Sequence, residues 1–370
     1  MKRMSHISAI GTANPPHRFS QSQIADFMTR AMQLSYEDGR KLRAIFNASG
    51  ISYRHSVLED YGRAGEFTFY SNTEDFEPFP STSKRMCFFK QNALNLSYSA
   101  VQNMLAQRPG FDLKSITHLI VVCCTGMYAP GLDVDLVKKL SLSTNVQRTG
   151  INFMGCYAAF NALKVADAFC KADAKAKVLV VCTELCSLHF QKVATEDNLL
   201  ANALFADGSA AVLVEGETTA TSRLRLENFC NELATEGEGD MAWAIGDLGF
   251  EMKLSTYVPD IIKSGISRLT AALLKNMSSD ISAIQFFAIH PGGRKILESI
   301  ESALGIDKEK NAPAYRVLKN YGNMSSPTVL FVLKDIFDGL TPAHNDQPIL
   351  SFAFGPGLTL ESMVLRIETE

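Results

Sequence analysis

The stretch GINFMGCYAAFNALKVADAF, residues 150–169, places one cysteine where an extended segment turns into a helix. The glycine before Cys156 permits a sharp turn, and the residues after the cysteine form an Ala-rich helical pattern. Only Lys164, Asp167 and Lys171 make a polar stripe on this helix. A helix that is apolar nearly all round is buried, so the chain must build a large core around it.

Cys156 lies at the positive end of the predicted helix. There the helix dipole and the free backbone N–H groups favour a thiolate, which is the nucleophilic form of cysteine. A free cysteine is also among the residues most often buried as a small apolar side chain. The residue alone therefore leaves a catalytic and a structural interpretation open.

Length, charge and composition narrow the class of protein. At 370 residues and 46% hydrophobic content, the chain can bury a large core and hold two domains or duplicated halves. Its net charge of -3 and the lack of a long basic run argue against nucleic acid as a partner. We see no signal-peptide pattern and no apolar stretch of membrane-spanning length. The eight cysteines lack zinc-type pairs and a secreted context, which predicts a reduced, cytoplasmic enzyme.

Several short β-rich runs alternate with helical patterns, which favours an α/β fold. The first three runs are almost continuously apolar, as expected of strands buried on both faces. The five runs are residues 116–126, 176–185, 209–216, 281–293 and 348–367.

The chain also contains signs of an internal duplication. In each half a strand ends in a reactive loop, CCTG or IHPGG, and a glycine-containing turn opens a buried helix about thirty residues later. The second such helix follows YGNMSSP, where Ser325 or Ser326 can act as the cap and Pro327 suits the first turn. We expect halves at 1–218 and 219–370, with residues 215–240 as a polar crossing between them.

A thiolate nucleophile needs a partner that holds its charge and donors for the oxyanion that it creates. His290 follows a strand and precedes Pro-Gly-Gly, and His189 is a second candidate beyond another strand end. Asn323 lies at the tight turn before the second buried helix. Each residue also has a plain structural interpretation: a hydrogen-bonded loop histidine, or an asparagine in a left-handed turn.

Four motifs together resemble the type III polyketide synthases, the chalcone-synthase-like branch of the thiolase superfamily. They are GCYAAFNAL with Cys156, HPGGRKIL with His290, YGNMSS with Asn323, and FAFGPGLT near the C-terminus. The similarity covers essentially the whole chain in the right order. The resemblance implies a five-layer αβαβα thiolase-like fold and a homodimer.

The resemblance also implies a reaction. Cys156 would be acylated by an acyl-CoA starter, and His290 and Asn323 would bind malonyl-CoA and stabilise the enolate formed as CO2 leaves. The extended chain would then cyclise to a pyrone, resorcinol or phloroglucinol. No metal, cofactor or acyl carrier protein is expected in this chemistry.

Further residues are assigned by the same resemblance. Phe205 and Phe250 match the gatekeepers between the CoA tunnel and the cavity, where apolar rings help to exclude water. Either residue is equally explained as ordinary core. The loop Gly355-Pro356-Gly357 is expected to shape the cavity floor.

The cavity positions differ from those of the plant enzymes, which makes a flavonoid role doubtful. Cys124, Cys186 and His189 stand where plant enzymes have threonines, Ala201 and Met241 stand where glycine is common, and Ser325 is retained. Met241 fills volume that a plant-type cavity leaves open. The run MAWAIGDLGF and Cys186 look more like bacterial members, which use malonyl or fatty-acyl starters.

At the expected CoA entrance, Lys41 matches one family cation, but Ala44 and Ala48 replace two others. Arg43, Arg294 and Lys295, beside Gly292 and Gly293, are candidates to bind the phosphates instead. Ala129 replaces a methionine that reaches across the plant dimer. Two alternative functions stay open: a ketoacyl-acyl-carrier-protein synthase of the initiating type, and a non-catalytic acyl-CoA-binding scaffold.

Overall fold

The computed structural model describes residues 3–255, 257–277 and 280–370. Its large sheet has the strand order β11-β12-β13-β8-β1-β7-β6-β4-β5. The strands of the first half are β1 (Ser5–Ala13), β4 (His118–Cys123), β5 (Gln147–Asn152), β6 (Lys177–Leu185) and β7 (Asp207–Glu215). The strands of the second half are β8 (Ser222–Leu233), β11 (Phe286–Ile289), β12 (Pro348–Gly355) and β13 (Thr359–Thr369).

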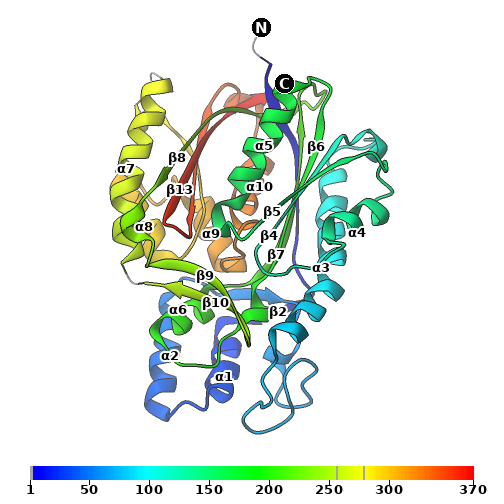
Figure 1. The fold of residues 1–370 in the computed structure, drawn as a ribbon. Coiled ribbons are helices and arrows are strands. Elements are labelled where there is room, and N and C mark those ends of the chain that lie inside the picture. Colours follow the sequence, from blue (N-terminus) through cyan, green and yellow to red (C-terminus); the bar gives the residue numbers. More distant parts are fainter. Residues whose placement is uncertain (1–2, 256, 278–279) are drawn as a thin grey trace.

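The large sheet is two half-sheets joined at one narrow seam. Strand β1 pairs with β8 only through Ser5–Leu226, His6–Arg225 and Ile7–Leu224, whereas β1 pairs with β7 along most of its length. The two half-sheets can therefore diverge beyond the seam, and the space between them is filled by helices (Figure 1).

Helices and the two half-sheets alternate in five layers (Figure 1). The middle layer contains α5 (Ala158–Ala172) and α10 (Thr328–Asp338). On one outer face lie α3 (Thr82–Leu105) and α4 (Leu132–Lys139), and on the other lie α7 (Val258–Met277) and α8 (Arg294–Leu304). The predicted five-layer αβαβα fold is confirmed by this order and by the solved structures compared below.

The two central helices are buried as their sequences predict. In α5, Ala158, Phe160 and Leu163 have no exposed surface, and in α10 Val329 and Leu333 have none. Burial of each large apolar side chain contributes about 1.5–3 kcal/mol. This core fixes the starts of α5 and α10, where Cys156 and Asn323 lie.

The remaining elements gather mostly at one end of the layers (Figure 1). They include two small sheets of two strands each and four helices. The sheets pair β2 (His17–Ser20) with β3 (Tyr53–Ser56), and β9 (Met241–Gly246) with β10 (Gly249–Leu254). The helices are α1 (Gln21–Ala31), α2 (Tyr36–Ala48), α6 (Glu196–Leu204) and α9 (Ala312–Tyr321).

Two local predictions are wrong. Residues 222–233 of the predicted polar crossing 215–240 form strand β8, which alternates polar residues with the buried Leu224 and Leu226. Neither Ser325 nor Ser326 caps α10, because the Ser325 backbone is left-handed and the Ser326 hydroxyl donates to Glu184. The boundary at 218/219 stays a prediction.

Within the described ranges, no helix has the length and apolar character needed to cross a membrane.

Candidate active site

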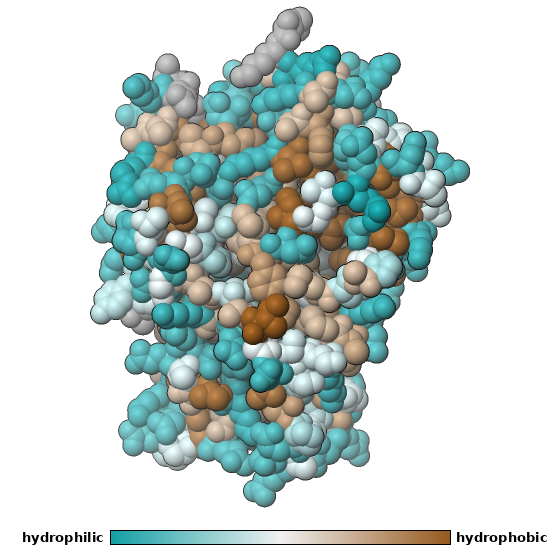
Figure 2. Space-filling model, viewed as in Figure 1, coloured by the Kyte–Doolittle hydropathy of each residue, from teal (hydrophilic) through white to brown (hydrophobic). Residues whose placement is uncertain are grey.

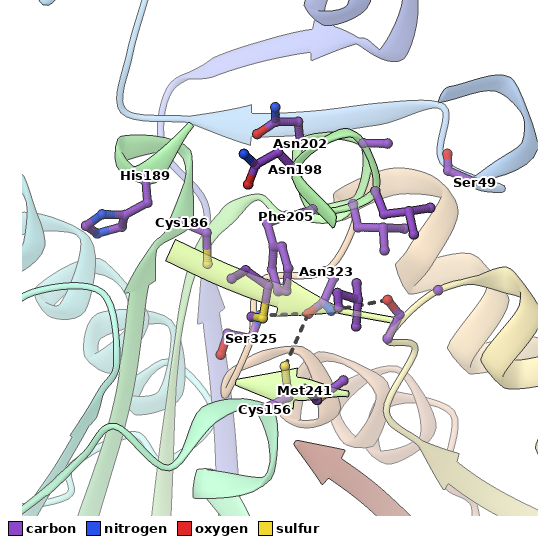
Figure 3. Close-up of a pocket in the computed structure, with 18 of the residues that line it drawn as sticks. Ser49, Cys156, Cys186, His189, Asn198, Asn202, Phe205, Met241, Asn323 and Ser325 are labelled. Atoms are coloured by element: carbon purple, nitrogen blue, oxygen red, sulfur yellow. Dashed lines mark hydrogen bonds between the residues drawn. The ribbon is translucent and has the colours of Figure 1, made fainter. Parts of the chain in front are cut away.

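An apolar cavity of about 270 Å³ is lined by residues of α2, α6, β9 and β10 and of the turns before the two central helices. Both halves of the chain line it. Cys156 and Phe205 come from the first half, and Met241, Asn323 and Ser325 come from the second (Figure 3). The cavity therefore brings the predicted nucleophile Cys156 from one half together with polar groups from the other.

The turn before α5 positions Cys156. Gly155 has φ +79°, and a Cβ on it would lie 2.4 Å from Pro356 Cδ. A Cβ on Gly355 would lie 3.3 Å from the Cys156 nitrogen. The loop 355–357 thus packs directly against the nucleophile turn, and both glycines are needed for that approach.

Cys156 contacts Asn323 at the inner end of the cavity (Figure 3). The thiol Sγ lies 3.9 Å from Asn323 Oδ1, which also accepts the Ser325 N–H at 2.8 Å. Asn323 Nδ2 donates to the Gly292 carbonyl over a long 3.3 Å. The left-handed residues of this turn are Gly322 and Ser325, so the interpretation of Asn323 as a left-handed turn residue is wrong.

His290 lies just behind the cavity wall, after strand β11. It is completely buried, its ring meets Phe354 edge-on at 5.4 Å, and Phe354 itself lines the cavity. Neither ring nitrogen has a hydrogen-bond partner among the described residues. A buried imidazole without partners is costly, so His290 is poised to accept a partner that arrives in the cavity.

Burial keeps both groups neutral in the protein without substrate. It raises the pKa of the Cys156 thiol to about 12, and the nearby Glu184 adds to this effect while Ser325 and Asn323 oppose it. Burial lowers the pKa of His290 to about 3. Burial therefore disfavours the predicted thiolate in the protein without substrate.

His189 is held in place by backbone groups on both of its ring nitrogens. Nε2 donates to the Thr125 carbonyl at 2.7 Å, and Nδ1 accepts the Phe250 N–H at 2.9 Å. Its ring stacks on Phe250 at 4.3 Å, and burial lowers its pKa to about 3. With both nitrogens occupied, His189 is a wall residue and does not serve as the partner of the thiolate.

Glu184 connects the two halves beneath the cavity. The carboxylate is completely buried on β6, and it accepts hydrogen bonds from the Cys124 N–H at 2.9 Å and the Thr125 hydroxyl at 2.7 Å. Its other oxygen accepts the Ser326 hydroxyl at 2.6 Å. Burial raises the pKa of Glu184 to about 7, so the carboxyl titrates near neutral pH.

Comparison with known proteins agrees with this geometry. The family model for the N-terminal domain of chalcone and stilbene synthases matches residues 2–218, and the model for the C-terminal domain matches residues 225–368. These two matches cover nearly the whole chain. The chain belongs to the chalcone and stilbene synthase family of type III polyketide synthases.

Individual relatives show the same likeness. The α-pyrone synthesis polyketide synthase-like Pks18 of Mycobacterium tuberculosis is 31% identical over 98% of this chain and 91% of Pks18. Probable polyketide synthase 1 of Dictyostelium discoideum is 32% identical, but this chain spans only 11% of that protein.

Two solved structures superpose on nearly the whole chain. PKS-I of the brown alga Ectocarpus siliculosus has a TM-score of 0.91 at 29% identity, covering 99% of both chains. The C-terminal type III polyketide synthase domain of Steely1 from Dictyostelium has a TM-score of 0.90 at 31% identity, covering 99% of this chain and all of that one. As a family member, this type III polyketide synthase is an enzyme of the acyltransferase class.

Most of the predicted site residues of this polyketide synthase line the one cavity, although their roles stay predictions. Besides Cys156 and Asn323, the lining includes the predicted gatekeepers, wall residues and entrance residues. These are Phe205, Phe250, Cys124, Cys186, His189, Ala201, Met241, Ser325, Gly292, Gly293, Arg294, Lys295 and Pro356.

Two of the predicted CoA-binding cations lie away from the cavity wall. Lys41 pairs with Glu37 and Asp38 on its own helix, and Arg43 pairs with Asp26. Both side chains are exposed, so these pairs are weak and do not exclude a phosphate. Arg294 and Lys295, which open α8, do line the cavity, and their role in binding CoA stays a prediction.

Several lining residues were missed by the sequence analysis. Trp243 Nε1 donates to the Cys124 carbonyl at 2.8 Å, and its ring meets His189 and Phe250 edge-on. Arg54 also lines the cavity. Trp243 is the single tryptophan of the chain, and this could have marked it in the sequence as a candidate site residue. Arg54 lies in a strand of four residues, where no sequence pattern distinguishes it as a site residue. No group of three metal-ligating side chains occurs within the part of the chain that the structure describes.

Proposed function

We propose that the chain condenses malonyl-CoA with an acyl-CoA starter held on Cys156 and cyclises the product. The observation that carries this proposal is the contact of Cys156 with Asn323 at the inner end of an apolar cavity. The nucleophile Cys156 and the oxyanion donor Asn323 come from different halves of the chain, and both line the same cavity. The unpartnered imidazole of His290 beside this space supplies the third group.

In the first step, the Cys156 thiol transfers its proton to His290 and attacks the thioester carbonyl of the starter. The C–S bond to CoA breaks, the proton leaves with the CoA thiolate, and the starter remains as a thioester on Sγ. Proton transfer within a dry cavity avoids an isolated charge, because the thiolate and the imidazolium form together. This step explains why both groups can be neutral at rest.

In the second step, malonyl-CoA loses CO2, and the electrons of the broken C–C bond form an enolate on the thioester. His290 and Asn323 donate to the enolate oxygen, with Asn323 Nδ2 leaving its long contact to Gly292. The enolate carbon attacks the acyl-Cys156 carbonyl, a C–C bond forms, and the cysteine thiolate departs. Apolar Phe205 and Phe250 exclude water and favour loss of the neutral CO2.

The remaining parts of the proposal rest on the family. We propose that the enzyme works in the cytoplasm as a homodimer, without a metal, cofactor or acyl carrier protein. Pks18 is named for α-pyrone synthesis, which favours a pyrone over a resorcinol or phloroglucinol here. The starter is an acyl-CoA that fits the cavity bounded by His189, Trp243 and Phe250.

The test is to incubate the protein with malonyl-CoA, alone and with acyl-CoA starters of graded length. Products are identified by mass spectrometry, with Cys156→Ala as the matched blank. Pyrones or resorcinols whose mass follows the starter, absent from the blank, would support the proposal. Product that forms only with malonyl groups on a carrier protein would favour an initiating ketoacyl synthase. No cysteine-dependent product with either donor would favour the scaffold.

A further inference from the structure

The hairpin of β9 and β10 forms one wall of the cavity. It lines the cavity with Met241, Trp243, Phe250, Met252 and Leu254. Trp243 lies opposite Met252 in the strand pairing, so both side chains share one face of the hairpin. Among the described residues, β9 and β10 pair only with each other. A sheet of two strands is only marginally stable by itself, so the position of this wall depends on what holds its ends.

The start of α3 holds the tip of this hairpin. Thr82 is the first residue of α3, and its backbone N–H, which has no partner within the helix, donates to the Asp247 carbonyl at 2.8 Å. The Thr82 hydroxyl accepts the Gly249 N–H at 2.8 Å and donates to the Gly246 carbonyl. One threonine therefore bonds to both strands of the hairpin where they meet, directly before Phe250.

Arg85, on the next turn of α3, holds the loop that carries His189. The Arg85 side chain is completely buried. Its Nη1 donates to the carbonyls of Leu188 and Phe190, the two neighbours of His189. Its Cδ and Nε lie against Gly249, where φ is +113° and a Cβ would come within 2.9 Å of both atoms. The planar guanidinium thus fixes this loop relative to the hairpin.

The hairpin and the loop meet in an aromatic wall of the cavity, formed by His189, Trp243 and Phe250. The Phe250 N–H donates to His189 Nδ1, the rings of these two residues stack, and Trp243 contacts both rings edge-on. Helix α3, which the structure describes in full, contributes no residue to the cavity lining. It nevertheless bonds to both parts of the chain that build the aromatic wall.

We propose that Thr82 and Arg85 are positioning residues that fix the aromatic wall and thereby limit the length of the polyketide chain. The inference rests on the proposed function, because a chain must grow on Cys156 before its length can be limited. Thr82 and Arg85 act through the aromatic wall and do not touch the reacting groups. Without them the wall recedes from the cavity, and longer chains fit before they cyclise.

The experiment compares the wild type with Thr82→Val, Thr82→Ser, Arg85→Met and Arg85→Lys in two measurements. Products formed from an acyl-CoA starter and malonyl-CoA are identified by mass spectrometry. The fluorescence of Trp243, the single tryptophan of the chain, reports the position of the aromatic wall. We expect Thr82→Val and Arg85→Met to add longer products and to raise the quenching of Trp243 by acrylamide. Thr82→Ser keeps the hydroxyl and should behave as the wild type, and Arg85→Lys, which lacks the planar fork, should lie between.

Thr117→Val is the matched control, because the Thr117 hydroxyl donates to the Lys177 carbonyl and accepts the Lys177 N–H, both at 3.0 Å. Thr117 precedes β4, whereas the cavity residue Cys124 follows that strand. The control should lower the melting temperature and leave the products and the quenching of Trp243 unchanged. If Arg85→Met does not fold, Thr82→Val and Arg85→Lys carry the comparison.

Wild-type products from Thr82→Val and from every folded Arg85 variant would overturn the role in chain length, even where the quenching of Trp243 rises. Longer products from Thr82→Ser or Thr117→Val would also overturn it, because the shift would then not depend on the Thr82 hydroxyl. A wild type that forms no product and does not acylate Cys156 would overturn the proposed function. In that case, unchanged quenching in Thr82→Val would overturn the positioning role as well, and raised quenching would support it.

Discussion

Glu184 illustrates how one buried side chain couples two halves of the molecule. It accepts hydrogen bonds from the loop after β4 and from Ser326 beside the Asn323 turn. Its removal would leave three buried donors unpaired, at a cost of about 1–3 kcal/mol each. The carboxyl group therefore supports the geometry of the site from outside the cavity lining.

The raised pKa of Glu184 predicts a pH-dependent stability. The folded-state pKa is about 7, above the ordinary 4.5, so the folded protein binds the proton more tightly than the unfolded chain. The free energy of unfolding should then fall as pH rises from about 4.5 through 7, by on the order of 3 kcal/mol from this group. Urea unfolding at pH 5 and pH 8 measures the change.

Glu184→Gln is the comparison that isolates this carboxyl group, because the amide has the same shape and can donate to Ser326 while accepting from Cys124 and Thr125. We expect the variant to lose less stability than the wild type between pH 5 and pH 8. Equal losses in the two proteins would show that Glu184 does not titrate in this range.

His189 is predicted to limit the size of the product. Its ring is fixed by Thr125 and Phe250 and forms a wall with Trp243. His189→Ala should open space behind this wall and shift products to longer chains, with about 2–4 kcal/mol less stability from the cavity and the unpaired backbone groups. Mass spectrometry of products checks the shift, and an unchanged product distribution at reduced stability would contradict it.

At the scale of elements, the turn before α5 depends on one glycine. Gly155→Ala forces a side chain into a left-handed backbone and against Pro356. We expect at least about 1 kcal/mol loss of stability and a slower reaction of Cys156 with iodoacetamide. Gly65→Ala is the control, since nothing lies within 4 Å of a Cβ there. Normal alkylation rates in Gly155→Ala would refute the role of this turn.

The central elements were predictable and the outer ones were not, for physical reasons. Helices α5 and α10 and strands β4, β6 and β7 are apolar enough that only burial explains them. Strand β8 was not predicted because its polar residues pair with charged residues of the neighbouring strand β13, such as Arg225 with Glu368. The motifs predicted Cys156 and Asn323, which line the cavity, and His290 beside it, whereas Arg54 is defined only by contacts with residues distant in sequence.

At the scale of the whole molecule, strand β5 ends the large sheet and has no strand beyond it among the described residues. Exposed apolar side chains, among them Met127 and Ile245, lie on the molecular surface, and apolar groups gather on the face shown in Figure 2. An unpaired sheet edge and exposed apolar side chains are each suited to contact with a second copy. These features support the proposed homodimer.

If the protein is a homodimer, sedimentation at micromolar concentration should give a mass of twice the 40.6 kDa of one chain. Met127→Asp places a charge on this exposed apolar position and should raise the dissociation constant. Tyr36→Asp, at an exposed position on α2, is the matched control. A monomeric wild type, or equal dissociation in both variants, would contradict the proposed interface.

The central claim is that Cys156 is the residue that carries the growing acyl chain. The most direct measurement is the intact mass of the protein after brief exposure to an acyl-CoA without malonyl-CoA, followed by peptide mapping. The account predicts one added acyl group per chain, located on Cys156 and absent from Cys156→Ala. Acylation at Cys124 or Cys186, or no added mass with any acyl-CoA, would contradict it.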